Sequence, residues 1–298
     1  MAFPFRIILF AMVILVHATT LLSQNDDDVI NVDSSLVVLN ATISDISGKP
    51  VAGLTQKNFK IFEEGAEQEI SLFTSEDTPF AAVLLIDTSG SMEGSVSMAR
   101  AAAIRFLDGL RQSDSTAIYR FDSKVTLVQE FSNSRDITEN IFDLKADGMT
   151  ALNDAVFLAA GELGKRTEKR RAIIVLSDGQ DTISKRSADK ALKAALAVNA
   201  LIYTVDMSAI NSSRRTQNQG PLKNFAEKSG GIFVATPGGV AMRAAFANIV
   251  GELGVQYTLG YQPINARKDG KWRAIELSVA KPNLTIRTRK GYNAEKAK

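Results

Sequence analysis

The sequence predicts an α/β protein in which a doubly wound, mostly parallel sheet is joined to a small β module built from strands at both ends of the chain. Three continuous apolar runs, residues 81–86, 172–176 and 200–205, support the sheet, because strands covered on both faces lack polar alternation. Segments of helical length separate these runs. Before and after this region apolar residues recur with a period of two, which predicts antiparallel strands.

The first 23 residues have the layout of a secretory signal peptide. One basic residue, Arg6, precedes an apolar run over 7–16, and small and polar residues follow. This run is shorter than the ~20 residues of a membrane-spanning helix, so we expect cleavage rather than a retained anchor, and no stable membrane span afterwards. Export combined with 0 Cys favours a bacterial protein, secreted or in the cell envelope, at the periplasm or the cell surface.

Residues 29–77 are expected to form the N-terminal part of the β module. Apolar side chains alternate along 37–43, and turn residues at 47–50 end that strand. Residues 59–62, a turn at 63–66 and residues 70–73 are expected to form a hairpin.

Residues 79–253 alternate strands with helices, which predicts parallel strands joined by right-handed crossovers. Residues 208–220 are polar and without periodicity, so we expect a mobile loop there. Further strands are expected at 116–121, 125–128 and 232–234, and helices at 99–110, 136–144, 151–163, 187–198, 222–228 and 240–253.

Residues 255–292 return to a period of two, with strands expected at 257–261, 275–279 and 284–286. Three strands alone would expose unpaired edges. We therefore expect them to pair with the N-terminal strands, which makes the α/β domain an insertion in the β module.

The composition excludes several kinds of chemistry. With 0 Cys the chain has no thiolate nucleophile, zinc–cysteine site or iron–sulfur cluster. The single His, His17, lies in the predicted signal peptide, so the mature chain would have neither a Ser-His-Asp triad nor a His-ligated metal. Lys and Arg number 35 against 33 Asp and Glu, a formal net charge of +2, which gives no strong attraction to nucleic acid. Any metal must be held by oxygen.

Oxygen-bearing side chains gather where two of the apolar strands end. Asp87, Ser89 and Ser91 follow the first strand at once, and the carboxyl edge of a parallel sheet is where such folds bind ligands. Asp178 follows the strand at 172–176, and Thr150 opens a helix between the two. One carboxylate and two hydroxyls on a turning loop form a hard ligand set that suits Mg²⁺, Mn²⁺ or Ca²⁺.

Each of these residues also has a simpler interpretation. Asp87, Ser89 and Thr150 can cap the helices that follow them, and Asp178 can belong to an ordinary turn. Their order on strand ends favours a single site over independent caps. Asp154, Gln180 and Asp181 flank the set and are expected to support it or to face solvent rather than to bind metal.

These residues resemble the metal-ion-dependent adhesion site of the von Willebrand factor A domain, a Rossmann-like fold. The Asp-x-Ser-x-Ser motif of that family matches Asp87, Ser89 and Ser91, its isolated Thr matches Thr150, and its later Asp matches Asp178. The segments that flank the domain look like those of exported bacterial proteins related to this family.

The resemblance, which covers about 79–253, implies a bound Mg²⁺ (or Mn²⁺ or Ca²⁺) and a protein partner whose Asp or Glu completes the coordination. It also implies that the last helix of the domain, 240–253, shifts with ligand occupancy. We therefore expect an exported, divalent-cation-dependent protein-binding or adhesion module rather than an enzyme. Two alternatives stay open: a metal-dependent hydrolase with Asp154 or Asp181 as its base, and a structural protein of envelope assembly.

Overall fold

The computed structural model describes residues 36–75, 78–133, 144–208, 215–235 and 239–296. The predicted signal peptide lies outside the described residues, as does the predicted helix at 136–144 except for its last residue. None of the described helices has both the length and the apolar composition needed to cross a bilayer.

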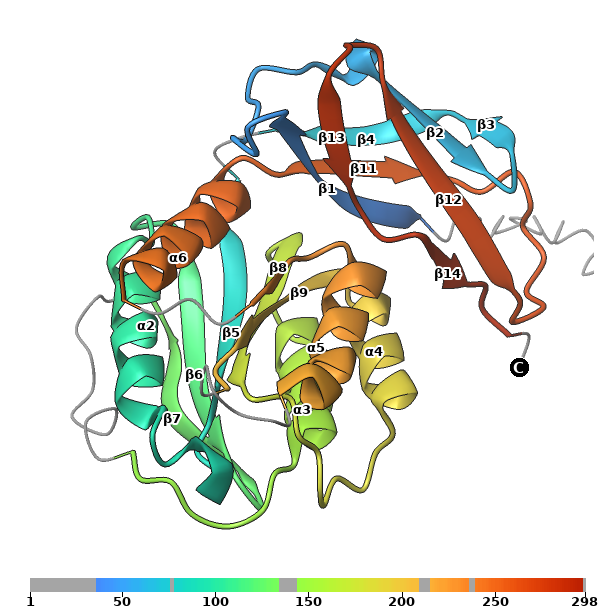
Figure 1. The fold of residues 1–298 in the computed structure, drawn as a ribbon. Helices are drawn as coiled ribbons and strands as arrows, with labels where there is room; N and C mark the ends of the chain where they lie inside the picture. The colour runs from blue at the N-terminus through green and yellow to red at the C-terminus, as the bar shows by residue number, and fades with distance from the viewer. Residues whose placement is uncertain (1–35, 76–77, 134–143, 209–214, 236–238, 297–298) are drawn as a thin grey trace, which may run out of the picture. The chain divides into compact units, whose positions relative to one another are not determined.

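A six-stranded sheet forms the centre of the α/β domain (Figure 1), which confirms the predicted fold class. Neighbouring strands are parallel throughout, apart from the antiparallel pair β6 and β7. In their order across the sheet the strands are β10 (Phe233–Val234), β9 (Ala200–Asp206), β8 (Arg170–Ser177), β5 (Phe80–Asp87), β6 (Ser115–Phe121) and β7 (Val125–Ser132).

Helices cover both faces of this sheet, so its central strands are apolar on both sides. Successive residues of β5 point to opposite faces: Leu84 and Ile86 lie in one core cluster and Val83 and Leu85 in the other. The first face is covered by α2 (Val96–Asp108) and α6 (Gly239–Gly254), and the second by α3 (Leu152–Gly164), α4 (Ala188–Ala197) and α5 (Arg215–Ser229).

Helix α5 begins at Arg215, so the predicted loop over 208–220 is wrong from residue 215 onwards. Two features hide the start of this helix in the sequence. Its first residues are polar, and Pro221, which lacks a backbone N–H, lies inside the helix. Only after this proline do the apolar residues Leu222 and Phe225 pack into the core.

The β module consists of two antiparallel sheets of four strands each. The first has the order β13-β1-β11-β4 and the second β14-β12-β2-β3. Each sheet contains strands from both ends of the chain, which confirms the predicted pairing of the C-terminal strands with the N-terminal ones. The strands are β1 (Val37–Asp45), β2 (Phe59–Glu63), β3 (Ala66–Gln68), β4 (Ile70–Thr74), β11 (Tyr257–Tyr261), β12 (Trp272–Val279), β13 (Leu284–Arg287) and β14 (Gly291–Asn293), and a short 3-10 helix, η1 (Gln56–Asn58), precedes β2.

The predicted turn at 63–66 is present, but the strand that follows it is β3 and not the predicted strand at 70–73. Glu63 lies opposite Ala66, and the two residues between them, Glu64 and Gly65, have positive φ angles of 49° and 82°. This is the geometry of the tight two-residue turn that suits a β-hairpin, so β2 pairs with β3. Strand β4 instead pairs with β11 in the other sheet.

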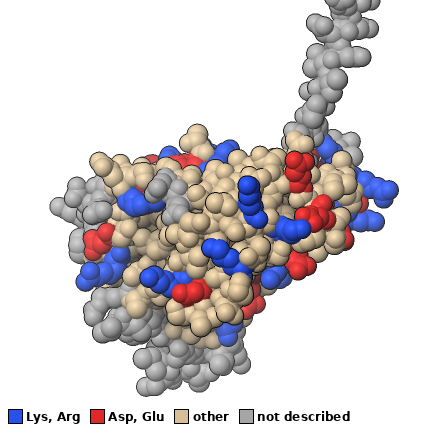
Figure 2. All heavy atoms as spheres, turned by 90° about the horizontal axis from the view of Figure 1, so that it is seen from above, with Lys and Arg blue, Asp and Glu red and all other residues tan. Residues whose placement is uncertain are grey.

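Charged side chains of both signs share the surface. On the face drawn in Figure 2, Lys and Arg are interspersed with Asp and Glu, and the formal net charge of the whole sequence is +2. A surface of this kind exerts little long-range attraction on a polyanion.

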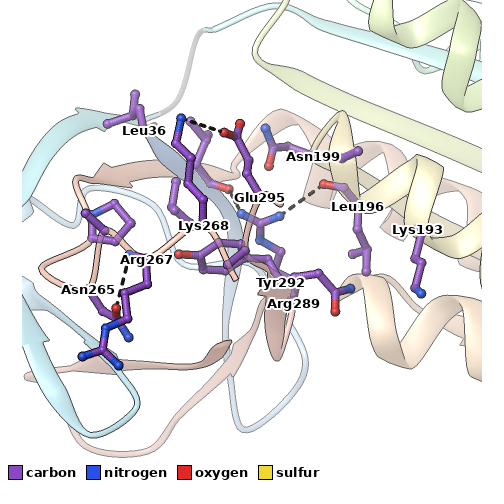
Figure 3. A pocket seen from close by; sticks show the side chains of 17 residues that line it. Leu36, Lys193, Leu196, Asn199, Asn265, Arg267, Lys268, Arg289, Tyr292 and Glu295 are labelled. Atoms are coloured by element: carbon purple, nitrogen blue, oxygen red, sulfur yellow. Dashed lines mark hydrogen bonds and ion pairs between the residues drawn. The ribbon is translucent and has the colours of Figure 1, made fainter. Parts of the chain in front are cut away.

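Arg289 joins the β module to the end of helix α4. Its guanidinium donates to the carbonyl oxygens of Leu196 (3.2 Å) and Val38 (2.8 Å). Leu196 lies in the last turn of α4, where carbonyls lack helical partners and a cation is favoured. A pocket of about 370 Å³ lies beside this joint. Figure 3 shows Lys193 and Arg267 on opposite sides of Arg289, so these basic side chains do not converge on one ligand.

Tyr257 links the two ends of the chain inside the β module. Its hydroxyl donates to the carbonyl oxygen of Val51 (2.9 Å) and accepts from the backbone N–H of Leu54 (3.0 Å). We expect Tyr257→Phe to lower the free energy of unfolding by about 1–3 kcal/mol, because two backbone groups lose their partner in a buried place. Urea unfolding followed by circular dichroism measures this. An unchanged midpoint would show that the contact between the two ends contributes nothing to stability.

Candidate functional site

The candidate site lies at the carboxyl edge of the central sheet, where β5 and β8 end side by side. These strands are parallel, and Ile86 pairs with Leu176 in their register. The next residues along the two strands are Asp87 and Ser177, and the Ser177 hydroxyl donates to Asp87 Oδ2 at 2.5 Å. The register of two buried strands therefore brings polar side chains that are distant in sequence into direct contact.

The loop after β5 turns back on the Asp87 carboxylate. Asp87 is fully buried, and its Oδ1 accepts the backbone N–H of Ser89 at 2.9 Å. The hydroxyls of Ser89 and Ser91 lie 3.1 Å apart. Thr88 fixes the loop, since its backbone N–H donates to the carbonyl oxygen of Phe121 at 2.8 Å. The structure thus brings together the three residues of the predicted Asp-x-Ser-x-Ser motif.

Capping does not explain the predicted residues that precede helices. Helix α2 has Ser95 at its N-cap position, and α3 has Ala151 there, so Asp87 and Thr150 cap neither helix. Ser89 precedes the short 3-10 helix η2 (Gly90–Met92), but its side chain makes no capping hydrogen bond. Asp178 does take part in a turn, because its Oδ1 accepts the backbone N–H of Gln180 at 3.1 Å.

The loop that carries Thr150 is tied to the first loop through the backbone. Gly90 N–H donates to the carbonyl oxygen of Gly148 at 3.0 Å, and Asp147 N–H to that of Thr88 at 2.9 Å. Gly148 has φ +77°, and a Cβ on it would lie 2.8 Å from Ser123 Oγ, so this position requires glycine. Thr150 itself is buried, and its N–H donates to Thr182 Oγ1 at 2.9 Å.

The flanking acidic residues support the neighbouring loop. Asp154 accepts the backbone N–H groups of Lys185 (3.0 Å) and Arg186 (3.1 Å). Asp181 accepts those of Asn153 (2.7 Å) and Ser184 (3.2 Å). Both carboxylates therefore hold the segment after β8 against helix α3.

Burial leaves the Asp87 carboxylate poorly stabilised as an anion. It raises the pKa of Asp87 to about 6, although hydrogen bonds from Ser177 and Ser89 act in the opposite direction. The neighbouring carboxylate of Asp178 raises this pKa further. A cation placed between the two carboxylates would relieve this cost.

The donor set suits a hard divalent cation. The predicted set contains two carboxylates, Asp87 and Asp178, and the three hydroxyls of Ser89, Ser91 and Thr150; contacts join Asp87 to Ser89 and Ser89 to Ser91. Oxygen ligands of this kind are those that Mg²⁺, Mn²⁺ and Ca²⁺ prefer. In the described part of the chain no three His, Cys, Asp or Glu side chains gather in one place, so hydroxyls would have to complete the coordination.

Two further polar residues lie at this edge, and the sequence pattern did not single them out as part of the candidate site. Ser177 accepts the N–H of Gly179 at 3.0 Å while it donates to Asp87. Asp206, at the end of β9, is fully buried and accepts from Gln219 Nε2 at 2.7 Å. Both directly follow apolar strands, as Asp87 does. That position was the signal that could have identified them.

Fold and site together define a class: doubly wound α/β domains that present a polar ligand-binding edge at the carboxyl ends of their strands. Comparison with known proteins identifies the family within this class. Residues 82–180 match the family model described as the von Willebrand factor type A domain. The match to the von Willebrand factor type A domain thus covers about a third of the chain.

Individual relatives match only part of their own length. An uncharacterized protein of Synechocystis is 32% identical over 108 residues, which are 35% of this chain and 26% of that protein. Inter-alpha-trypsin inhibitor heavy chain H3 of Bos taurus is 26% identical over 126 residues, which are 38% of this chain and 14% of that protein. The solved structure of von Willebrand factor type A from Catenulispora acidiphila is 13% identical, with a TM-score of 0.50 over 89% of this chain and 75% of that one, and shows the fold alone.

The raised pKa of Asp87 predicts a pH-dependent gain in stability on Asp87→Asn in EDTA. The folded state holds the Asp87 proton more tightly than the unfolded chain does, so ionisation costs the folded state free energy as pH rises from about 4 through about 6. Asn keeps an acceptor for Ser89 N–H without this cost. The free energy of unfolding of Asp87→Asn minus that of wild type should therefore increase by up to about 3 kcal/mol between pH 4 and pH 7.

Urea unfolding at a series of pH values, with EDTA present throughout, measures this difference. A stability difference that stays constant across the series would contradict a raised pKa for Asp87.

Proposed function

We propose that the von Willebrand factor type A domain of this protein is a divalent-cation-dependent protein-binding module. The observation that carries the proposal is the buried Asp87 carboxylate, held by Ser177 and Ser89, with a pKa that the negative charge of Asp178 helps to raise. A buried carboxylate in such surroundings is costly unless a cation compensates it.

Five residues would hold the cation, which is Mg²⁺, Mn²⁺ or Ca²⁺. The ligands we propose are Asp87, Ser89, Ser91, Thr150 and Asp178. When bound, a divalent ion with few anionic ligands offers an open coordination position that attracts a carboxylate. Ser177 orients Asp87 through the 2.5 Å hydrogen bond. The backbone bond from Gly90 to Gly148 keeps the two loops together.

A protein partner that supplies an Asp or Glu side chain fits this arrangement best. The resemblance of the motif to the family's adhesion site supports the same partner chemistry. Hydrolysis is less well supported, because it would need a free carboxylate as base. Asp154 and Asp181, the nearby candidates, already accept two backbone N–H groups each. Export to the envelope remains a prediction from the N-terminal sequence, and a fixed role in envelope assembly would use the same contact.

Binding of Mn²⁺, followed by electron paramagnetic resonance, tests the ligand set. Wild-type protein should bind one Mn²⁺, and Asp178→Asn should weaken that binding roughly tenfold or more, because an anionic ligand is lost. Asp147→Asn is the matched control, since it removes one exposed carboxylate from the adjacent loop. Equal Mn²⁺ affinity of wild type and Asp178→Asn would show that Asp178 is not a ligand of the ion.

Partner capture from the envelope of the native host tests the function itself. We expect a protein that binds in Mg²⁺ and is released by EDTA, and we expect Asp87→Ala to abolish its capture while circular dichroism shows an intact fold. Undiminished capture after both treatments would contradict a cation-dependent mechanism.

A further inference from the structure

The pocket of about 370 Å³ beside the joint between helix α4 and the β module is a second candidate binding site (Figure 3). Its lining residues come from the start of β1, the end of α4, the loop after β11 and the segment around β14. One of them, Asn199, directly precedes β9, so the pocket lies at the amino edge of the central sheet. The candidate metal site lies at the carboxyl edge, which makes the two sites distinct.

Basic side chains outnumber acidic ones in this pocket. Among the described residues its lining contains Lys193, Arg267, Lys268 and Arg289 but a single acid, Glu295. Glu295 pairs with Lys268 at 3.5 Å. Lys193 and Arg267 are exposed, and in the described part of the chain neither side chain has an acidic partner. A hollow lined mainly by one sign of charge concentrates the electrostatic field and attracts groups of the opposite sign.

Arg289 adds a buried positive charge to the pocket. Its side chain is 8% exposed, and its Nε is buried without a hydrogen-bond partner in the described structure. Its other two nitrogens donate to uncharged carbonyl oxygens, and the buried carboxylate of Glu63 instead accepts the hydroxyl of Tyr292 at 3.0 Å. Burial lowers the pKa of Arg289 to about 10. A buried cation without a counter-charge is costly, and an anionic group in the pocket would offset that cost.

The positions of the exposed cations favour an extended ligand over a compact one. Lys193 and Arg267 lie on opposite sides of Arg289 (Figure 3), so one small anion would not bind both. An extended polypeptide can bring a separate acid to each of them, because its residues rise about 3.3 Å each and alternate side chains face the same way.

We propose that this pocket is a second partner site, which binds an extended protein segment with at least two Asp or Glu side chains. One acid pairs with Lys193 and the other with Arg267, while the segment passes through the field of Arg289. This site requires no metal ion. It therefore goes beyond the proposed function, and its test is independent of the candidate metal site.

Selection from a random peptide library displayed on phage tests this, with the full chain immobilised in EDTA throughout. Wild type should enrich peptides with two or more acidic residues. The double variant Lys193→Ser/Arg267→Ser should bind an enriched peptide roughly three- to thirtyfold more weakly, because two exposed ion pairs are lost. Fluorescence anisotropy measures this affinity, and circular dichroism checks that the variant is folded.

The matched control is Lys57→Ser/Lys281→Ser, which changes the net charge by the same amount at exposed positions outside the pocket. It should bind the peptide as wild type does. Equal binding by wild type and the pocket variant would overturn the inference, as would the absence of acidic peptides from the wild-type selection. Binding to phosphatidylglycerol vesicles in place of acidic peptides would assign the basic side chains to a lipid surface and overturn it as well.

Discussion

The hydrogen bond between Ser177 and Asp87 is the contact on which the candidate site depends. It forms because β5 and β8 are parallel neighbours whose last apolar residues, Ile86 and Leu176, pair in register. A slip of one residue would turn the polar ends away from each other, since successive side chains of a strand face opposite sides. Helices that bury both faces of the sheet fix that register. The packing of the core thus sets the geometry of the site.

Burial of the Asp87 carboxylate at this edge costs the folded protein free energy. The negative charge of Asp178 raises the pKa of the desolvated Asp87 further, and hydrogen bonds from Ser177 and Ser89 offset this in part. Functional sites commonly contain a charge that the protein alone compensates only in part, and a bound ligand then supplies the remaining compensation. We propose that the two carboxylates and three hydroxyls are such a site, in which a bound hard cation would offset the cost of the buried negative charge.

Much of this could be predicted from the sequence, and the failures have physical causes. Continuous apolar runs identify strands buried on both faces, so the central sheet and the position of Asp87 followed directly. The predicted turn at 63–66 forms, but the strand after it, β3, is short and largely polar, so the apolar pattern pointed to 70–73 as the partner instead. Helix α5 starts in a polar segment and contains Pro221. The role of Ser177 depends on strand order, a long-range property that local patterns do not reveal.

Diffraction from crystals soaked in Mn²⁺ is the sharpest test of the proposed metal site, because the anomalous signal locates the ion without assumptions about a partner. We expect one strong peak at the carboxyl edge of the sheet, with oxygens of Asp87, Ser89 and Ser91 either at about 2.0–2.4 Å from it or joined to it through a single water. No peak there, with those oxygens directed away from a common point, would contradict it and leave a von Willebrand factor type A fold without this metal site.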